Sequence, residues 1–164
     1  MLGAGERRRM MQEGDTIPEV SLTLPDGATL ALGEHVGHPF VLYFYPKDDT
    51  TGCTREAQEF SAAYEDFRAL GATVLGVSKD TPAKHAKFIA KYELTVPLAS
   101  DDADGTALDA FGVWVEKQLY GKKYMGIDRS TFLFAADGTL TKAWHKVKVP
   151  GHVAAVLDAV RSLE

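Results

Sequence analysis

Residues 40–53 of the chain read FVLYFYPKDDTTGC. The first six, Phe40 to Tyr45, form a continuous apolar run, which is typical of a central strand buried on both faces. Pro46 ends this strand because proline has no backbone N–H to donate to a ladder. A loop follows, and Cys53 stands where a helix begins. The stretch therefore predicts a strand–loop–helix unit of an α/β protein.

Apolar residues recur after Cys53 at spacings of three and four, the period of a helix face. They are Ala57, Phe60, Tyr64 and Phe67. Cys53 shares this face and lies in the first helical turn, where free N–H groups and the helix dipole favour a thiolate. We expect Thr50 or Thr51 to cap the helix and to leave a hydroxyl near the sulfur.

The rest of the chain alternates between strand and helix patterns. We expect strands near residues 20–24, 30–32, 73–77, 96–99, 131–134 and 140–144, and helices near 82–92, 106–111 and 153–163. The first two strands form an N-terminal β-hairpin extension, and residues 113–127 form an extra ribbon. The predicted fold class is α/β, with a central mixed sheet flanked by helices.

Composition narrows the class of protein. The 164 residues suit one domain, which we place at residues 13–164 after a disordered N-terminal extension over residues 1–12. The net charge of −5, without a basic stripe, disfavours nucleic acid. No apolar run could cross a membrane, and no secretory signal is present. The single cysteine fits a reducing compartment, so we expect a cytoplasmic protein.

Two further motifs carry a family resemblance. The stretch YPKDDTTGCTREA at residues 45–57 closely resembles the Pro-x-x-x-Thr-x-x-Cys signature of peroxiredoxins, above all that of the Q-type, or bacterioferritin-comigratory, subgroup. The stretch GIDRSTFL at residues 126–133 resembles the strand that carries the family's active-site arginine. Residues 144–152 resemble the subgroup's final segment, so that the match covers about residues 12–164.

The resemblance implies a thioredoxin fold and an antioxidant peroxidase that reduces hydrogen peroxide and organic hydroperoxides without a cofactor or metal. Cys53 is then the redox-active nucleophile and passes through a sulfenic acid. Thr50 hydrogen-bonds the peroxide, Pro46 shields the sulfur from water, and Arg129 stabilises the thiolate and the reacting oxygens.

A lowered pKa of the thiol explains little of the rate at which a peroxidase reacts with peroxide. Fuller deprotonation at pH 7 gains about 30-fold. The weaker nucleophilicity of a more acidic thiol loses about 13-fold, which leaves a net gain of only about twofold. Orientation of the O–O bond and stabilisation of the departing oxygen must supply the rest. Thr50 and Arg129 therefore matter as much as the sulfur.

The chain departs from the family pattern in its cysteine count. Many Q-type members carry a resolving cysteine five residues after the first, where this chain has Gln58, or on the following helix, where residues 88–90 hold none. With Cys53 alone no intramolecular disulfide forms. The resemblance thus implies a one-cysteine cycle, in which an external thiol from a thioredoxin or glutathione system reduces the sulfenic acid.

Other interpretations of the same residues stay open at this stage. Cys53 could be a small core residue, Thr50 only a cap, Pro46 only a strand stop, and Arg129 a surface ion-pair partner of Asp128. The main functional alternative is a non-enzymatic redox sensor or binding module that uses Cys53 stoichiometrically.

Two enzymatic alternatives are weaker. A disulfide reductase needs a second cysteine three residues after Cys53, and Glu56 stands there. A hydrolase elbow around Ser78 lacks its second glycine. The histidines show no metal motif, and we expect surface or capping positions for all five. They are His35, His38, His85, His145 and His152.

Overall fold

The computed structural model describes residues 11–101 and 105–163 of the chain. The expected disordered extension over residues 1–12 therefore falls largely outside the described residues. Within them, Met11 is partly buried against a hydrophobic cluster, and the backbone N–H of Gln12 donates to the carboxylate of Asp15.

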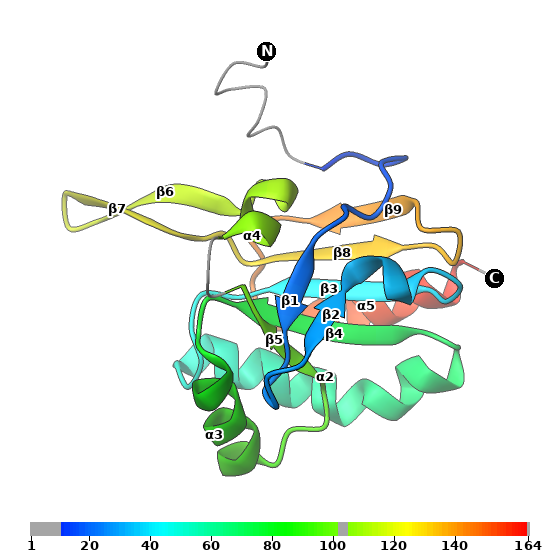
Figure 1. Ribbon diagram of the computed structural model, residues 1–164, viewed down its shortest axis with the longest axis horizontal. Helices are drawn as coiled ribbons and strands as arrows, with labels where there is room; N and C mark the ends of the chain where they lie inside the picture. Colours follow the sequence, from blue (N-terminus) through cyan, green and yellow to red (C-terminus); the bar gives the residue numbers. More distant parts are fainter. Residues whose placement is uncertain (1–10, 102–104, 164) are drawn as a thin grey trace.

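Seven strands form one mixed sheet in the order β2-β1-β5-β4-β3-β8-β9 (Figure 1). Their bounds are β1 Ser21–Thr23, β2 Thr29–Ala31, β3 Phe40–Phe44, β4 Thr73–Ser78, β5 Leu98–Ser100, β8 Ser130–Phe134 and β9 Leu140–Trp144. The central strand β3 pairs with β4 in parallel and with β8 in antiparallel orientation. All five residues of β3 are buried, as its uninterrupted apolar sequence predicts.

Two strand regions differ slightly from expectation. The fifth strand starts at Leu98 and not at Val96, because Pro97 has no N–H to give to the ladder. The N-terminal hairpin is no separate appendage, since Thr23 of β1 pairs with Ser100 of β5 and joins the hairpin to the edge of the sheet. After β2 the chain forms a short 3-10 helix, η1 Leu32–His35.

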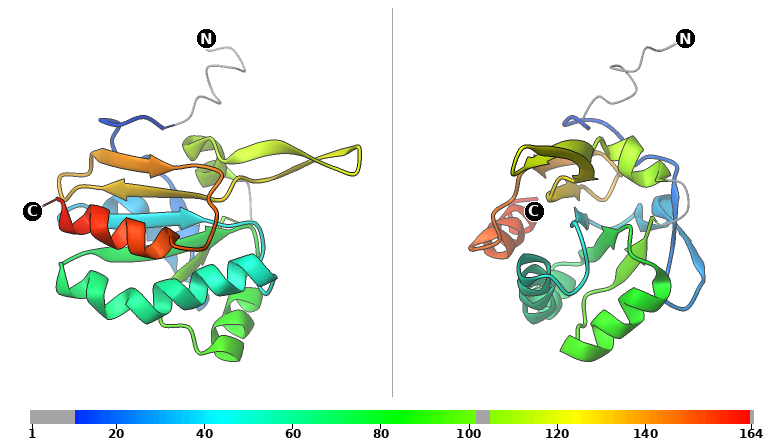
Figure 2. Two further views of the ribbon diagram at one scale, coloured as in Figure 1. Left: turned by 180° about the vertical axis from the view of Figure 1, so that it is seen from behind. Right: turned by 90° about the vertical axis from the view of Figure 1, so that its left-hand side faces the viewer.

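Helices cover both faces of the sheet. Helices α2 (Thr51–Ala69) and α5 (His152–Arg161) lie side by side on one face (Figure 2), and α3 (Pro82–Tyr92) adds Phe88 to the hydrophobic cluster beneath them. The short α4 (Thr106–Phe111) contributes to the cluster on the opposite face. The predicted α/β architecture with a mixed, helix-flanked sheet is confirmed.

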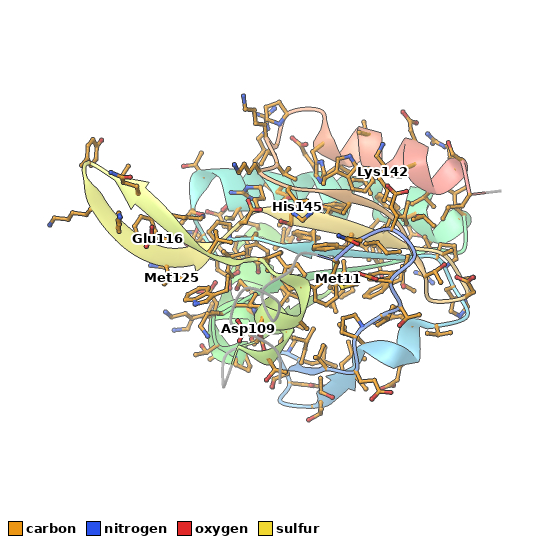
Figure 3. All side chains as sticks on the ribbon, turned by 90° about the horizontal axis from the view of Figure 1, so that it is seen from above. Met11, Asp109, Glu116, Met125, Lys142 and His145 are labelled. Carbon is orange, nitrogen blue, oxygen red and sulfur yellow. The ribbon has the colours of Figure 1, made fainter. Side chains whose placement is uncertain are left out.

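The expected extra ribbon is a two-stranded antiparallel sheet of β6 (Trp114–Leu119) and β7 (Lys122–Ile127). It projects from the body at one end of the molecule (Figure 1). Figure 3 shows it from above, with the cross-strand partners Glu116 and Met125 labelled. At the root of the ribbon β7 leads through Asp128 and Arg129 directly into β8, which fixes the position of the arginine.

Candidate active site

Cys53 is the third residue of α2, as the sequence predicts. Its side chain is 2 % exposed and belongs to the hydrophobic cluster under α2 and α5. The backbone N–H groups of a first helical turn have no partners within the helix, and the helix dipole is positive there. The sulfur therefore lies in an environment that favours an anion, next to the end of the central strand.

Arg129, which lies 76 positions after Cys53 between β7 and β8, contacts the sulfur. Its Nη2 donates to Sγ of Cys53 at 3.4 Å, and its Nη1 donates to Oε1 of Glu56 at 2.7 Å. Gly52 makes this approach possible, because a Cβ there would lie 3.1 Å from Nη2. The alternative of a surface ion pair between Arg129 and Asp128 is wrong, since the partner of the guanidinium is the buried Glu56.

Glu56 is the main site residue that sequence reasoning missed. It is fully buried, and its Oε2 has no hydrogen-bond partner among the described residues. Burial raises the pKa of Glu56 to about 7, although the charge and hydrogen bond of Arg129 work in the opposite direction. Burial also acts to lower the pKa of Arg129, but Glu56 and Cys53 outweigh it and raise that pKa, so the guanidinium stays charged.

This raised pKa predicts a pH-dependent stability. In the folded state this carboxyl keeps its proton to a higher pH than in the unfolded state. Its contribution to stability is therefore fully present below its ordinary pKa of 4.5 and is lost as the pH rises to about 7. The gap between the two pKa values corresponds to about 3 kcal/mol. Relative to Glu56→Gln, the wild type should therefore lose about 3 kcal/mol of unfolding free energy between pH 4.5 and 8. Urea denaturation across this range measures the difference.

The control for this experiment is Glu65→Gln, which changes an exposed glutamate of the same helix. Its difference from the wild type should stay nearly constant with pH. A difference between the wild type and Glu56→Gln that is independent of pH, or that grows in favour of the wild type as pH rises, would contradict the raised pKa.

Thr50 and Pro46 lie on the loop between β3 and α2. Thr50 occupies the N-cap position of α2, but the expected side-chain cap is wrong. Its Oγ1 donates at 2.9 Å to the backbone carbonyl of Lys47 instead. Pro46 follows Tyr45 directly after β3 and is half-buried. Within the described residues no side-chain hydrogen bond joins Thr50 to Cys53. The structure brings Arg129 into direct contact with Cys53. Thr50 and Pro46 lie on the loop that leads to Cys53, without a side-chain hydrogen bond to it.

A buried polar network holds this loop against α3. The carboxylate of Asp48 accepts a hydrogen bond from the Tyr45 hydroxyl, and its other oxygen lies 2.6 Å from Nδ1 of His85. The backbone N–H of Asp48 donates to Asp80 at 2.8 Å. The sequence gives no signal for the network, because its members are up to 40 positions apart and meet only in the folded chain.

The expectation of surface or capping positions is wrong for His85 and His152. His85 is fully buried within the Asp48 network. His152 is 6 % exposed, and its Nε2 lies 2.7 Å from Oγ1 of Thr131. Burial, and secondarily the charge of Arg129, lowers the pKa of His152 to about 4, so this ring is neutral at pH 7.

In the part of the chain that the structure describes, no group of three or more His, Cys, Asp or Glu side chains is placed to hold a metal ion. None of its helices is long and apolar enough to cross a membrane. The chemically distinctive arrangement is thus the sulfur of Cys53 at the helix start, beneath a charged guanidinium.

A buried cysteine at the start of α2, contacted by an arginine from the segment between β7 and β8, fits the class of thiol-dependent peroxidases. The AhpC/TSA family profile matches residues 14–143. The chain belongs to the AhpC/TSA family, and within it is a peroxiredoxin of the Q type.

Curated relatives and solved structures match most of the chain. Peroxiredoxin Bcp of Xanthomonas campestris pv. campestris is 46 % identical over 144 residues, which cover 88 % of this chain and 89 % of the relative. Peroxiredoxin Bcp of Bacillus subtilis is 45 % identical over 150 residues, covering 92 % and 95 %. A structure of Xanthomonas campestris Peroxiredoxin Q superposes with a TM-score of 0.82 at 46 % identity, over 87 % of this chain and 90 % of that one. The thioredoxin fold that the family resemblance implies is confirmed.

Proposed function

We propose that the chain reduces hydrogen peroxide and organic hydroperoxides in a one-cysteine cycle, in which Cys53, Thr50, Arg129 and Pro46 form the catalytic pocket. The observation that supports this most strongly is the contact between Nη2 of Arg129 and Sγ of Cys53. A structural study of the Xanthomonas campestris bacterioferritin comigratory protein, 43 % identical over 90 % of this chain, concerns alkyl peroxide reduction.

In the first step the Cys53 thiolate attacks one peroxide oxygen. An S–O bond forms and the O–O bond breaks, and the departing oxygen takes up a proton to leave as water or an alcohol. Arg129 carries a positive charge beside both the sulfur and the oxygens that become negative, so it stabilises the transition state electrostatically. The peroxide is reduced and the sulfur becomes a sulfenic acid.

Thr50 and Pro46 orient the peroxide and keep water away. The single hydroxyl proton of Thr50 is donated to the Lys47 carbonyl. The lone pairs of Oγ1 are therefore available to accept a hydrogen bond from the peroxide O–H. Pro46 brings no N–H to the pocket and presents an apolar ring at the end of β3.

The second half of the cycle needs thiols from outside the chain, because Cys53 is its only cysteine. One external thiol condenses with the sulfenic acid, forming an S–S bond and releasing water. A second thiol attacks this mixed disulfide, and the products are the Cys53 thiol and a free disulfide. A thioredoxin or glutathione system is the proposed source of these thiols. We propose a cytoplasmic location, because a one-cysteine cycle depends on a reducing compartment.

Turnover separates this enzyme from a stoichiometric redox sensor. With excess peroxide and either a reduced thioredoxin system or glutathione, we expect many molecules of peroxide to be consumed per molecule of protein. The measurement is peroxide consumption over time at limiting protein. Consumption that stops at about one equivalent with both reductants would favour the sensor and overturn the catalytic cycle.

A further inference from the structure

A cavity of about 240 Å³ lies between the loop that carries Lys47 to Asp49 and helix α3. Phe88, which is 2 % exposed, forms its apolar part. Phe88 belongs to the same buried cluster as Cys53. Because Lys47, Asp48 and Asp49 line it, the cavity adjoins the loop that leads into α2 and Cys53, although none of the proposed catalytic residues lines it.

Four lysines line this cavity in a protein whose net charge is −5. Lys84, Lys87 and Lys91 follow one another at spacings of three and four, so α3 presents them on one face. Lys47 comes from the loop opposite. Neighbouring like charges on a helix repel one another, which costs stability unless an anion lies between them.

The three carboxylates that line the cavity are already engaged. Asp48 accepts from Tyr45 and lies against His85, and Asp80 accepts from the hydroxyl of Ser78 and the backbone of Asp48. Asp49 pairs with Lys91 at 2.8 Å and also accepts from Tyr92. Among the described residues, Lys47, Lys84 and Lys87 have no ion-pair partner.

We infer that this cavity binds a small anionic thiol, no larger than a short peptide, that carries carboxylate groups. This thiol is the reductant of oxidised Cys53. The inference rests on the proposed one-cysteine cycle. The carboxylates of the thiol contact Lys84 and Lys87, and its apolar part packs on Phe88. The cavity has room for a small molecule or one end of it.

The chemistry is that of the second half of the cycle. The bound thiol attacks the sulfur of the sulfenic acid, an S–S bond forms and the S–O bond breaks, and the hydroxyl leaves as water with the thiol proton. A second molecule of the same thiol then releases Cys53 as a free thiol and leaves as the disulfide. A ligand carboxylate also competes with Asp49 for Lys91, which loosens the loop that leads into α2.

The test uses glutathione and its diethyl ester, which share one thiol but differ in their carboxylates. The full-length protein is oxidised with one equivalent of hydrogen peroxide and mixed with either thiol at low salt and pH 7. Mass spectrometry of quenched samples follows loss of the sulfenic acid. The rate ratio, glutathione over ester, should be well above one and should fall about fivefold in Lys84→Gln/Lys87→Gln. Added salt should lower the wild-type ratio as well.

The matched control is Lys122→Gln/Lys123→Gln, which removes two neighbouring exposed lysines from the ribbon and should leave the ratio unchanged. The inference is overturned if the glutathione-to-ester rate ratio is unchanged in Lys84→Gln/Lys87→Gln, or if it falls equally in the control. It is also overturned if only a protein thiol reduces the sulfenic acid. Oxidation of Cys53 by peroxide is measured first on every variant. If Cys53 is not oxidised, the peroxidase cycle is refuted. If Cys53 is oxidised normally but the glutathione-to-ester rate ratio does not depend on Lys84 and Lys87, only the binding of the thiol in the cavity is refuted.

Discussion

Arg129→Ala should lower the rate constant for oxidation of Cys53 by hydrogen peroxide by about 10²–10³-fold, the usual effect of removing one donor that stabilises a developing negative charge. The guanidinium contacts the sulfur and stays charged although it is partly buried. The change in thiolate population accounts for only a small part of the loss, because deprotonation and nucleophilicity nearly offset one another. The measurement is the oxidation rate expressed per thiolate.

Two companion variants make this result specific. Arg129→Lys keeps a charge but cannot contact both Cys53 and Glu56, because an ammonium lacks the planar fork of a guanidinium, so it should recover little activity. Arg129→Ala/Glu56→Gln removes the buried carboxyl that Arg129→Ala leaves without a partner, and it should be as slow as Arg129→Ala while folding more stably. Wild-type rates per thiolate in Arg129→Ala would contradict the electrostatic role.

Gly76→Ala should destabilise the fold by about 3 kcal/mol, at the upper end of overpacking effects. A Cβ at Gly76 of β4 would lie 2.5 Å from Cζ of Tyr43, its partner on β3, and 2.7 Å from the hydroxyl oxygen. The Tyr43 ring is fully buried and stacks on Phe60 of α2 with ring centroids 4.4 Å apart. It therefore cannot move aside without displacing the helix that carries Cys53.

Chemical denaturation measures this effect. Gly33→Ala is the matched control, because a Cβ at Gly33 meets nothing within 4 Å, and it should change the unfolding free energy little. Replacing Tyr43 by the smaller Leu in the Gly76→Ala background should recover part of the loss. An unfolding free energy of Gly76→Ala equal to that of the wild type would show that the ring can adapt.

The sequence predicts those parts of the structure that follow from local pattern. The apolar run of β3 and the helical spacing of Ala57, Phe60 and Phe67 lead directly to the strand–loop–helix unit around Cys53. Boundaries shift where a single backbone property decides, as at Pro97. The motif resemblance leads to Arg129, which no local spacing relates to Cys53, since the two are 76 positions apart.

The missed residues are those whose role depends on tertiary burial. Glu56 follows Cys53 by three positions, but a glutamate on a helix is usually exposed to solvent, and only the packed structure shows that it is buried and pairs with Arg129. His85 and Asp48 meet because β3 and α3 bring them together. The spacing of Lys84, Lys87 and Lys91 indicates a basic helix face. Such a face predicts an anion site only when the structure shows what lies opposite, here the loop of residues 47–49.

The central claim is that peroxide oxidises one sulfur, that of Cys53, to a sulfenic acid. Intact-mass spectrometry after one equivalent of hydrogen peroxide, with and without a sulfenate-specific trap, tests it most directly. We predict a gain of one oxygen or of one trap adduct, located at Cys53 and absent from Cys53→Ser. An unmodified Cys53, or an adduct that persists in Cys53→Ser, would contradict the account.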